Sequence, residues 1–533
     1  MLGTVGLLAV LLPAWRGSRL DPMEDCVMSD LRFAIRQLLK NPSFTVVAVL
    51  TVALAPAVSA QSQPPVTGTN KLDFFETRQL IQKKMVEYSI PSISVAVARR
   101  GEILWEEGFG WADRENRIPA TEHTMYYMAS ANKAFTGVAL MILQERKQLD
   151  LDRPINGYLG AAKLTSPAWN SAEATVRRVA NHTAGLTTVN LGRRLPIDET
   201  IQRYGVIFWP PGERYDYSNI GYKILDEAVA RVSGASYSNF MRAEVFWPLG
   251  MTHTSAGIGP GLEKFVAQRY ITTRGLQPPI AGAIYSSAHD LARLGIFCLK
   301  TRLPDQKKIL SDAAIDAMYD SPISTGDSQY SLGWTLDDRF GYRGIEAHGG
   351  TTADQATLRL IPSEEIAVVA LANNGMMYPP TLIDAILSAL LPNYSENRAK
   401  AAEKKAHQDN TREGEGSRDS LPAALAGSWK GIVKTYREEI PLTFSIAQSG
   451  DVHVKLGSQL TTLLNDAKFD EQRLRGRMLG DLGVEDDTGS ERYHLEFYLD
   501  LRDGALKGAV VTAPNPGLPF WTELKKANPD TKQ

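Results

Sequence analysis

Apolar and polar positions follow two different periods in the middle of this chain. Residues 72–88 repeat apolar side chains at helical spacing, whereas residues 92–98 and 102–111 are strand-like runs joined by Arg100-Gly101. A glycine-containing pair between two such runs predicts a hairpin. Strand-like runs return at 357–361 and 366–372, after a mostly helical stretch to about residue 280 and before a helical repeat at 382–391. The pattern predicts a core of mixed helices and antiparallel strands.

The periodicity disappears after residue 392. Residues 397–419 contain no large apolar side chain. Such a charged stretch cannot bury enough surface to offset the entropy lost on ordering, so we predict a linker over residues 393–420, helical near 399–405.

Short alternating runs resume beyond the linker. They cover residues 441–446, 452–456, 493–499 and 505–511, and Asp503-Gly504 separates the last two. Asp-Gly between alternating runs is a strong signal for a two-residue hairpin. Residues 421–533 are therefore predicted to form a small β-domain.

Residues 1–61 have a different pattern again. Three basic residues (Arg32, Arg36 and Lys40) precede an apolar run over 44–55, which Pro56 ends, and small residues follow at 58–60. A run of this length is typical of a signal peptide and short for a membrane span. We predict export to the periplasm or secretion, with Met1 or Met28 as the start. The alternative is an inner-membrane anchor, because residues 28–40 resemble the start of bacterial ABC-transporter permeases.

Composition narrows the function only slightly. The 533 residues include 58 Lys and Arg against 60 Asp and Glu, a balance that gives no reason to expect nucleic-acid binding. Cys26 and Cys298 are the two cysteines, so the sequence has no disulfide framework. The histidines show no metal-ligand spacing such as His-Glu-x-x-His. We therefore predict neither a metal nor another cofactor.

The strongest chemical signal is Ser130 followed by Lys133. Residues three apart on a helix share one face, so the hydroxyl and the amine can meet. This suits a serine that must lose its proton to become a nucleophile. Free lysine has a pKa of about 10.4, so Lys133 can act as the base only if burial or a nearby positive charge lowers that value.

Two later strings add matching chemistry. Tyr217 and Asn219 follow a Pro-Pro-Gly turn, which places a phenol and an amide on a loop or at a helix start. His348 and Gly350 belong to His-Gly-Gly-Thr, and Thr351 comes directly after the paired glycines. Paired glycines let another group approach the backbone closely.

These three motifs resemble those of the serine β-lactamase and penicillin-binding-protein superfamily, over roughly residues 70–392. The resemblance is strongest to class C β-lactamases, D-alanyl-D-alanine carboxypeptidases, D-aminopeptidases and family VIII esterases. It implies an α/β (α+β) fold with a β-lactamase/transpeptidase-like antiparallel sheet, flanking helices and a helical subdomain over residues 62–392. The start of the β-domain, residues 425–429, resembles the small lipocalin-like barrel that often follows this core.

The resemblance also implies residue roles. Ser130 forms the acyl-enzyme, with Lys133 and Tyr217 as a coupled general base. Asn219 holds the substrate amide or positions Lys133, and the N–H groups of Ser130 and Thr351 form the oxyanion hole. His182, in a family-like string at 181–186, is predicted to be structural.

Two departures bear on the substrate. His348 stands where class C enzymes have a lysine, and Asp354 places a carboxylate near the predicted substrate edge. Both disfavour substrates that carry a carboxylate. We therefore predict a serine hydrolase of small esters or of amides, including D-amino-acid peptides, with β-lactams third.

Other readings of the same motifs stay open. The chain could be a penicillin-binding sensor that deacylates very slowly, or an idle scaffold of the same fold. The predicted partner is a small-molecule or peptide substrate. The N-terminal segment would be the means of any membrane attachment, and the sequence does not indicate an oligomeric state.

Overall fold

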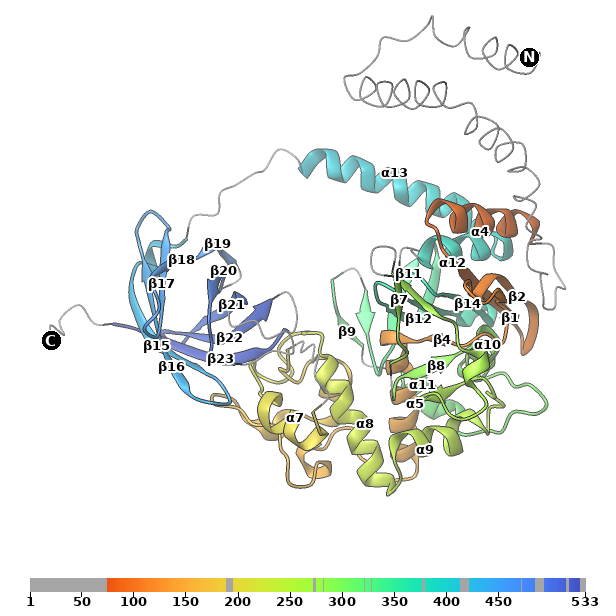
Figure 1. Ribbon diagram of the computed structural model, residues 1–533, viewed down its shortest axis with the longest axis horizontal. Helices are drawn as coiled ribbons and strands as arrows, with labels where there is room; N and C mark the ends of the chain where they lie inside the picture. Colours follow the sequence, from red (N-terminus) through yellow and green to blue (C-terminus); the bar gives the residue numbers. More distant parts are fainter. Residues whose placement is uncertain are drawn as a thin grey trace, which may run out of the picture. The chain divides into compact units, whose positions relative to one another are not determined.

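The computed structural model describes residues 74–187, 195–271, 275–280, 282–320, 322–326, 328–375, 379–412, 421–470, 472–484, 493–513 and 517–527 (Figure 1). The predicted signal or anchor at 1–61 lies outside these residues, and so does Cys26. None of the helices in the described ranges is long and apolar enough to cross a membrane.

The core domain is built on a long antiparallel sheet. Within the described residues its strand order is β3-β2-β1-β14-β13-β12-β11-β10-β9. The strands are β1 (Ser92–Arg99), β2 (Glu102–Asp113), β3 (Ile118–Pro119), β9 (Ile323–Ser324), β10 (Gln329–Tyr330), β11 (Thr335–Arg339), β12 (Tyr342–Gly350), β13 (Gln355–Ile361) and β14 (Ile366–Ala372). The earliest strands therefore pair with the latest, with β1 antiparallel to β14.

Helices cover both faces of this sheet. The helices α4, α5, α10 and α12 contact it, whereas α6 to α9 pack mainly on one another. The described helices of the core domain are α4 (Phe75–Glu87), α5 (Asn132–Glu145), α6 (Val176–Ala180), α7 (Ile197–Tyr204), α8 (Asn219–Ser233), α9 (Tyr237–Met241), α10 (Ala288–Cys298), α11 (Asp312–Ala317) and α12 (Pro379–Leu390). The neighbouring helices α4 and α12 share one cluster with Val95, Val97 and Val368, whereas Ala96 and Val369 face the cluster that contains α10 (Figure 1). Burial on both faces explains why β14 is a continuous apolar run and why β1 is apolar from Val95 to Ala98.

Shorter elements complete the core domain. A small sheet joins β4 (Tyr126–Tyr127), β8 (Ile284–Ser286) and β5 (Ser255–Ala256), and a hairpin joins β6 (Arg269–Ile271) to β7 (Gly275–Gln277). The described core domain also contains the short 3-10 helices η2 (Ala129–Ala131), η3 (Ile155–Tyr158), η4 (Ser171–Glu173), η6 (Glu263–Phe265) and η7 (Pro362–Glu364), and the π-helical segment η5 (Arg242–Phe246). Cys298, at the end of α10, is a buried free thiol in the apolar core.

The C-terminal domain is a nearly closed, barrel-like sheet. Its described strands are β15 (Gly427–Lys434), β16 (Glu439–Ile446), β17 (Val452–Leu456), β18 (Thr462–Leu463), β19 (Asn465–Asp470), β20 (Arg473–Gly480), β21 (Tyr493–Arg502), β22 (Ala505–Ala513) and β23 (Pro519–Lys526), after the turn η8 (Ala423–Leu425). Along β16 and β17 buried and exposed positions alternate, as a filled barrel requires. The predicted linker contains helix α13 (Tyr394–Arg412).

Both predicted hairpin turns are confirmed. Arg100 and Gly101 have φ values of 52° and 77°, and Asp503 and Gly504 have 50° and 73°. In each case the residues that flank the pair are directly paired across the two strands. Two consecutive residues with positive φ match the right-handed twist of the strands, which is why the local sequence was sufficient here.

Candidate active site

Ser130 lies in a tight turn at the start of α5. The turn η2 precedes the helix, and Ala129 has a φ of 44°, in the left-handed region that non-glycine residues seldom adopt. Gly349 of β12 lies directly against this turn, since a Cβ there would come within 2.5 Å of the Ser130 nitrogen. Ser130 is thus held between a helix start and the end of a strand.

Lys133 reaches back one turn of α5 to the serine. Its Nζ donates to Ser130 Oγ at 3.1 Å and to Asn219 Oδ1 at 3.0 Å. The side chain is 4% exposed, and burial lowers the pKa of Lys133 to about 8, while the nearby Asp226 carboxylate acts in the opposite direction. The lowered pKa is the condition that a lysine base needs.

Tyr217 approaches Ser130 from a different element. Its phenol donates to Ser130 Oγ at 2.7 Å, and the Lys133 ammonium lies 4.8 Å from its ring centroid. Burial raises the pKa of the Tyr217 phenol, and the bond to Ser130 only partly offsets that effect. Two residues later Asn219 begins α8, capped by Ser218, whose Oγ accepts from the Gly221 N–H at 3.2 Å.

His182 holds the tyrosine motif in place. The Nδ1 of this buried residue accepts from the Ser218 N–H at 3.1 Å, and its ring lies 4.5 Å from that of Tyr217. Burial and the Lys133 charge keep the pKa of His182 well below its ordinary value. A neutral imidazole that accepts a backbone bond fits the structural role predicted for it.

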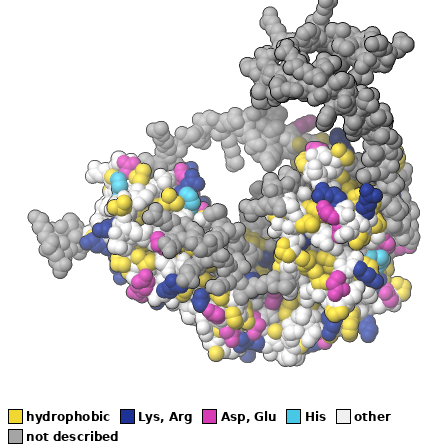
Figure 2. All heavy atoms as spheres, viewed as in Figure 1, with side chains coloured by type: hydrophobic (Ala, Val, Ile, Leu, Met, Phe, Trp, Pro, Cys, Tyr) yellow, Lys and Arg dark blue, Asp and Glu magenta, His cyan; other side chains and the backbone are white. Residues whose placement is uncertain are grey.

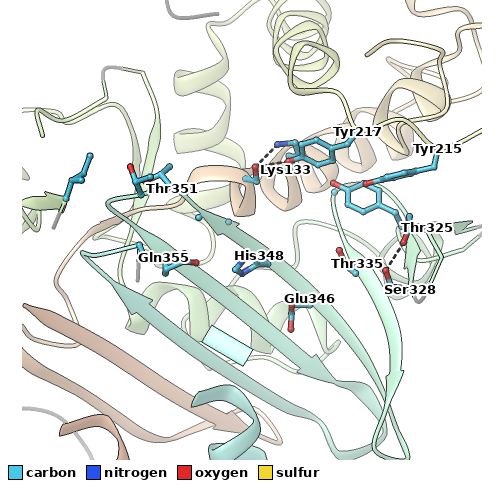
Figure 3. A pocket seen from close by; sticks show the side chains of 18 residues that line it. Lys133, Tyr215, Tyr217, Thr325, Ser328, Thr335, Glu346, His348, Thr351 and Gln355 are labelled. Atoms are coloured by element: carbon cyan, nitrogen blue, oxygen red, sulfur yellow. Dashed lines mark hydrogen bonds between the residues drawn. The ribbon is translucent and has the colours of Figure 1, made fainter. Parts of the chain in front are cut away.

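The wall opposite the helix comes from β12 and β13. His348 Nδ1 lies 2.9 Å from Thr357 Oγ1, and the residue lines the pocket. The surrounding protein lowers the pKa of His348, despite the opposing effect of Glu346. Figure 3 shows Lys133 and Tyr217 on the helical side, and His348 and Glu346 on the strand side.

Asp354, in the turn after β12, does not have the surroundings that the sequence predicted. This residue is 1% exposed, and its carboxylate is paired with Arg269, whose Nη2 lies 2.6 Å from Asp354 Oδ2. Its charge is therefore compensated inside the protein and does not face the substrate edge. The expectation of a repulsive carboxylate at that edge was wrong, because sequence alone could not show that Arg269 lies beside it.

The same turn engages Thr351. Its Oγ1 donates to Asp354 Oδ2 at 2.6 Å, and its N–H donates to the Asp354 carbonyl at 2.9 Å. An oxyanion at this position would have to share or displace that backbone bond. Thr351 nevertheless lines the pocket, as do Gly350 and His348.

These walls enclose a pocket of about 760 Å³ (Figure 3). It contains Ser130, Lys133 and Tyr217 together with His348, Gly350 and Thr351, so six of the seven predicted site residues line one cavity. The seventh, Asn219, accepts a hydrogen bond from Lys133, which lines the cavity. The remaining described lining is mostly hydroxyl, amide and aromatic: Tyr215, Ile271, Thr325, Ser328, Tyr330, Gly333, Thr335, Glu346, Gly349, Thr352, Gln355 and Gly375.

Asp226 is a site residue that the sequence analysis missed. It is a half-buried carboxylate on α8 that accepts from Thr136 Oγ1 at 2.8 Å, and desolvation raises its pKa to about 7. Asp226 lies seven residues after Asn219, and Tyr222 lies between them. A polar residue two helical turns from a motif residue, on an otherwise apolar helix face, is the signal that would have found it.

In the described ranges, no three side chains of His, Cys, Asp and Glu converge in a way that could hold a metal ion. The pocket lining supplies hydroxyl, amine, phenol and backbone groups.

Comparison with known proteins bears on the core domain. The family model described as Beta-lactamase matches residues 77–391. Protein flp of Staphylococcus aureus (strain MRSA252) is 25% identical over 327 residues, which are 57% of this chain and 64% of that protein. Unguisins hydrolase ungD' of Aspergillus campestris (strain IBT 28561) is 26% identical over 332 residues, 55% of this chain and 60% of that protein. The chain thus spans less than two thirds of the length of these curated relatives.

Solved structures share the fold. The octameric penicillin-binding protein homologue from Pyrococcus abyssi has a TM-score of 0.56 at 22% identity, over 85% of this chain and 100% of that one. A class C β-lactamase has a TM-score of 0.53 at 21% identity, over 60% and 96% of the two chains. The β-lactamase/D-alanine carboxypeptidase from Pseudomonas syringae has a TM-score of 0.52 at 18% identity, over 59% and 98%.

Proposed function

The chain belongs to the β-lactamase family, and from this membership we propose that it hydrolyses esters or amides through an acyl-enzyme on Ser130. One observation carries the proposal. The Ser130 hydroxyl is contacted at once by an amine and by a phenol, from Lys133 at 3.1 Å and from Tyr217 at 2.7 Å. A serine served by two proton-transfer groups in a pocket is the arrangement that nucleophilic catalysis needs.

Lys133 is the base in this proposal. With a pKa of about 8, roughly a tenth of the lysine is neutral at pH 7, and that fraction can take the serine proton. Tyr217 is a poor candidate for the base, because burial raises the pKa of its phenol and keeps it protonated.

Tyr217 has a complementary role. As Ser130 Oγ bonds to the substrate carbonyl carbon, its proton passes to Lys133. When the bond to the leaving alkoxide or amine breaks, a proton returns from Lys133 by way of the Tyr217 phenol. Water then attacks the acyl carbon and gives its proton to Lys133. As the bond from Ser130 Oγ to the acyl carbon breaks, that proton passes to Ser130 Oγ and the acid product leaves.

The strand side holds the substrate carbonyl. In this proposal the backbone N–H of Ser130 donates one hydrogen bond to the oxyanion. The N–H of Thr351 donates the second, which it must share with the Asp354 carbonyl. His348, with its lowered pKa, is largely neutral at pH 7 and offers a hydrogen bond instead of a fixed positive charge. Asn219 keeps Lys133 directed at the serine.

The pocket supports small, uncharged acyl substrates. A volume of about 760 Å³ lies in the usual range for small-molecule sites. Hydroxyl, amide and aromatic groups dominate its described lining. We therefore place short esters and D-amino-acid amides before β-lactams. The Aspergillus campestris relative is named a hydrolase, which supports a hydrolytic reaction.

The test compares wild type with Ser130→Ala on a short-chain p-nitrophenyl ester, a chromogenic cephalosporin and a D-alanyl-D-alanine peptide. We expect turnover of the ester or the peptide, and its loss in the variant. Ser449→Ala, the same change at an exposed turn of the barrel, should keep full activity. Equal inactivity of wild type and Ser130→Ala on all three substrates would remove the hydrolase proposal.

Intact-protein mass spectrometry distinguishes the two alternative functions, a penicillin-binding sensor and an idle scaffold. A stable adduct on Ser130 without turnover is the result expected of a penicillin-binding sensor. Neither adduct nor turnover is the result expected of an idle scaffold.

We also propose export, on the basis of the basic and apolar pattern at residues 28–60. Cell fractionation and N-terminal sequencing of the product test this. A mature chain starting near Gln61 outside the inner membrane would support cleavage, whereas an intact N-terminus in the membrane fraction would support the anchor.

A further inference from the structure

The loop that carries the tyrosine motif leaves the core domain and contacts the barrel. It runs from Trp209 to Asp216, directly before Tyr217. The Trp209 indole N–H donates to Asp216 Oδ2 at 2.7 Å, which closes the loop on itself. Its outer surface, including Glu213 and Arg214, meets residues of β20 and β21.

Two arginines, one from each domain, pack against the Trp209 ring. The Arg214 guanidinium lies 3.6 Å from a ring centroid of the indole, and that of Arg473 from the barrel lies 4.9 Å away. Guanidinium groups stack well on aromatic faces because they are planar and weakly hydrated. The tryptophan is 2% exposed, so this packing excludes water.

Asp500 of β21 joins both arginines. Its Oδ2 lies 2.9 Å from Arg214 Nη1, and its Oδ1 lies 2.8 Å from Arg473 Nε. The carboxylate is 5% exposed. Charge-assisted bonds to a buried carboxylate have strict geometry, and loss of one partner leaves the others uncompensated. Arg502, paired with Glu213 of the loop, adds a second link between the domains.

An apolar cluster backs these charges. Phe208 and Trp209 pack with Ala509 and Trp521 of the barrel. At Gly508 a Cβ would come within 2.7 Å of the Trp209 ring and 2.1 Å of the Tyr498 carbonyl, so this strand position needs glycine. The barrel surface is thus shaped to receive the tryptophan.

The contact continues inward to the nucleophile. The Asp216 N–H donates to the His182 carbonyl at 2.8 Å. The next residue is Tyr217, whose ring packs on His182 and whose phenol reaches Ser130. One short segment therefore touches the barrel at its start and the serine at its end.

We propose that the barrel is a working part of the active site: the barrel clamp, formed by Trp209, Arg214, Arg473 and Asp500, positions the loop that presents Tyr217 to Ser130. The four are positioning residues, since none touches the pocket. This proposal rests on the proposed function, in which Tyr217 moves a proton. It gives the C-terminal domain a role in the rate of acylation, beyond covering apolar surface.

The test uses the full chain with Asp500→Asn, which keeps the shape of the side chain and removes its charge. The matched control is Asp466→Asn. Asp466 pairs with Arg477 at 2.7 Å on the same barrel, but both side chains are more than 60% exposed. Two readouts are taken: amide hydrogen exchange of the peptide spanning 205–222, and kcat and KM for the p-nitrophenyl ester.

We expect faster exchange of the 205–222 peptide in Asp500→Asn, with exchange of the α10 peptide unchanged. We expect kcat to fall by about ten- to a hundredfold, with KM little changed, because misplacement of a catalytic group by about 1 Å has effects of this size. Asp466→Asn should match wild type in both readouts. Arg214→Gln and the double variant Arg214→Gln/Asp500→Asn should each lose about as much kcat as Asp500→Asn alone, because all three variants break the same clamp.

Each outcome decides the proposal. Unchanged exchange in both Asp500→Asn and Arg214→Gln would overturn it, whatever the activity. Faster exchange with unchanged kcat would also overturn it, since the barrel would then hold the loop without serving the reaction. If wild type has no turnover, the proposed function fails, and exchange alone decides whether the clamp exists. If Asp500→Asn does not fold, Arg214→Gln carries both readouts.

Discussion

At the scale of single residues, opposing effects on Lys133 decide how the site works. Burial lowers the pKa of its amine to about 8, and the nearby Asp226 carboxylate raises it. Without burial the lysine would stay charged at neutral pH and could not accept a proton. Without a nearby negative charge its pKa would fall further.

The first prediction follows from this pKa. We expect kcat/KM for an uncharged ester to rise with pH through an apparent pKa of about 8 and then to level off, because the neutral amine is the active form. At pH 7 the value should be roughly a tenth of the plateau. A stopped-flow profile from pH 6 to 10 measures it, and a profile flat across pH 7–9 would contradict Lys133 as the base.

The second prediction concerns Asp226→Asn. Loss of the carboxylate should lower the pKa of Lys133 and move the rising limb to lower pH, by up to about one unit. Asp466→Asn, with the same chemical change on the barrel surface, should leave the limb in place. A limb that stays fixed in both variants would mean that Asp226 does not act on the lysine.

The Asp226 carboxyl also makes the stability of the wild-type protein depend on pH. Burial raises the pKa of Asp226 to about 7 in the folded protein, against about 3.9 in the unfolded chain. The folded state holds the proton more tightly, so the stability that this group contributes at low pH is lost as pH rises from about 4 to about 7. Wild type should therefore lose stability relative to Asp226→Asn over that window.

At the scale of elements, the site depends on how closely β12 approaches the turn before α5. A Cβ at Gly349 would lie 2.3 Å from the Met128 carbonyl oxygen and 2.4 Å from the Ala131 nitrogen. These neighbours are backbone atoms and cannot turn aside as a side chain can. The glycine therefore sets the distance between Ser130 and strand β12.

The third prediction is that Gly349→Ala reduces kcat about a hundredfold, because the strand and the serine turn must move apart. We also expect a loss of about 1–3 kcal/mol in the free energy of unfolding, as overpacked sites show. Gly157→Ala is the control, since no atom lies within 4 Å of a Cβ placed there. Comparable activity of the two variants would show that the contact relaxes easily.

At the scale of the whole molecule, ion pairs between distant segments hold the pocket walls together. Arg269 of β6 and Asp354 of the β12–β13 turn are 85 residues apart in sequence and form a buried, bidentate pair. Elsewhere, basic and acidic side chains are interspersed with hydrophobic ones on the face shown in Figure 2. Exposed pairs of that kind contribute little to stability.

The fourth prediction compares these two classes of pair. Asp354→Asn should reduce the free energy of unfolding by about 3–5 kcal/mol, because it leaves the buried Arg269 charge without its partner. Asp466→Asn should change it by less than about 1 kcal/mol. Denaturant unfolding of both variants measures the difference, and equal, small changes would show that the buried pair behaves like a surface pair.

Sequence reasoning succeeded where the physical cause is local. Strand β14 coincides with the predicted run at 366–372, because seven consecutive apolar residues suit a strand buried on both faces. Ser130 and Lys133 meet because three residues span about one helical turn. It was wrong about the charge of Asp354, and it missed Asp226 and the barrel clamp, because those effects depend on segments far away in the chain.

The sequence by itself determined the chemical groups of this protein: a serine, a lysine, a phenol and a pair of glycines in the motifs of one family, and the local turns that join its strands. These follow from side-chain type, helical spacing and backbone freedom over a few residues. Only the tertiary structure decided the pKa of Lys133, the compensation of Asp354 by Arg269, and the contact of the barrel with the loop before Tyr217. Burial and charge pairing arise when distant segments meet, and no local pattern records that meeting.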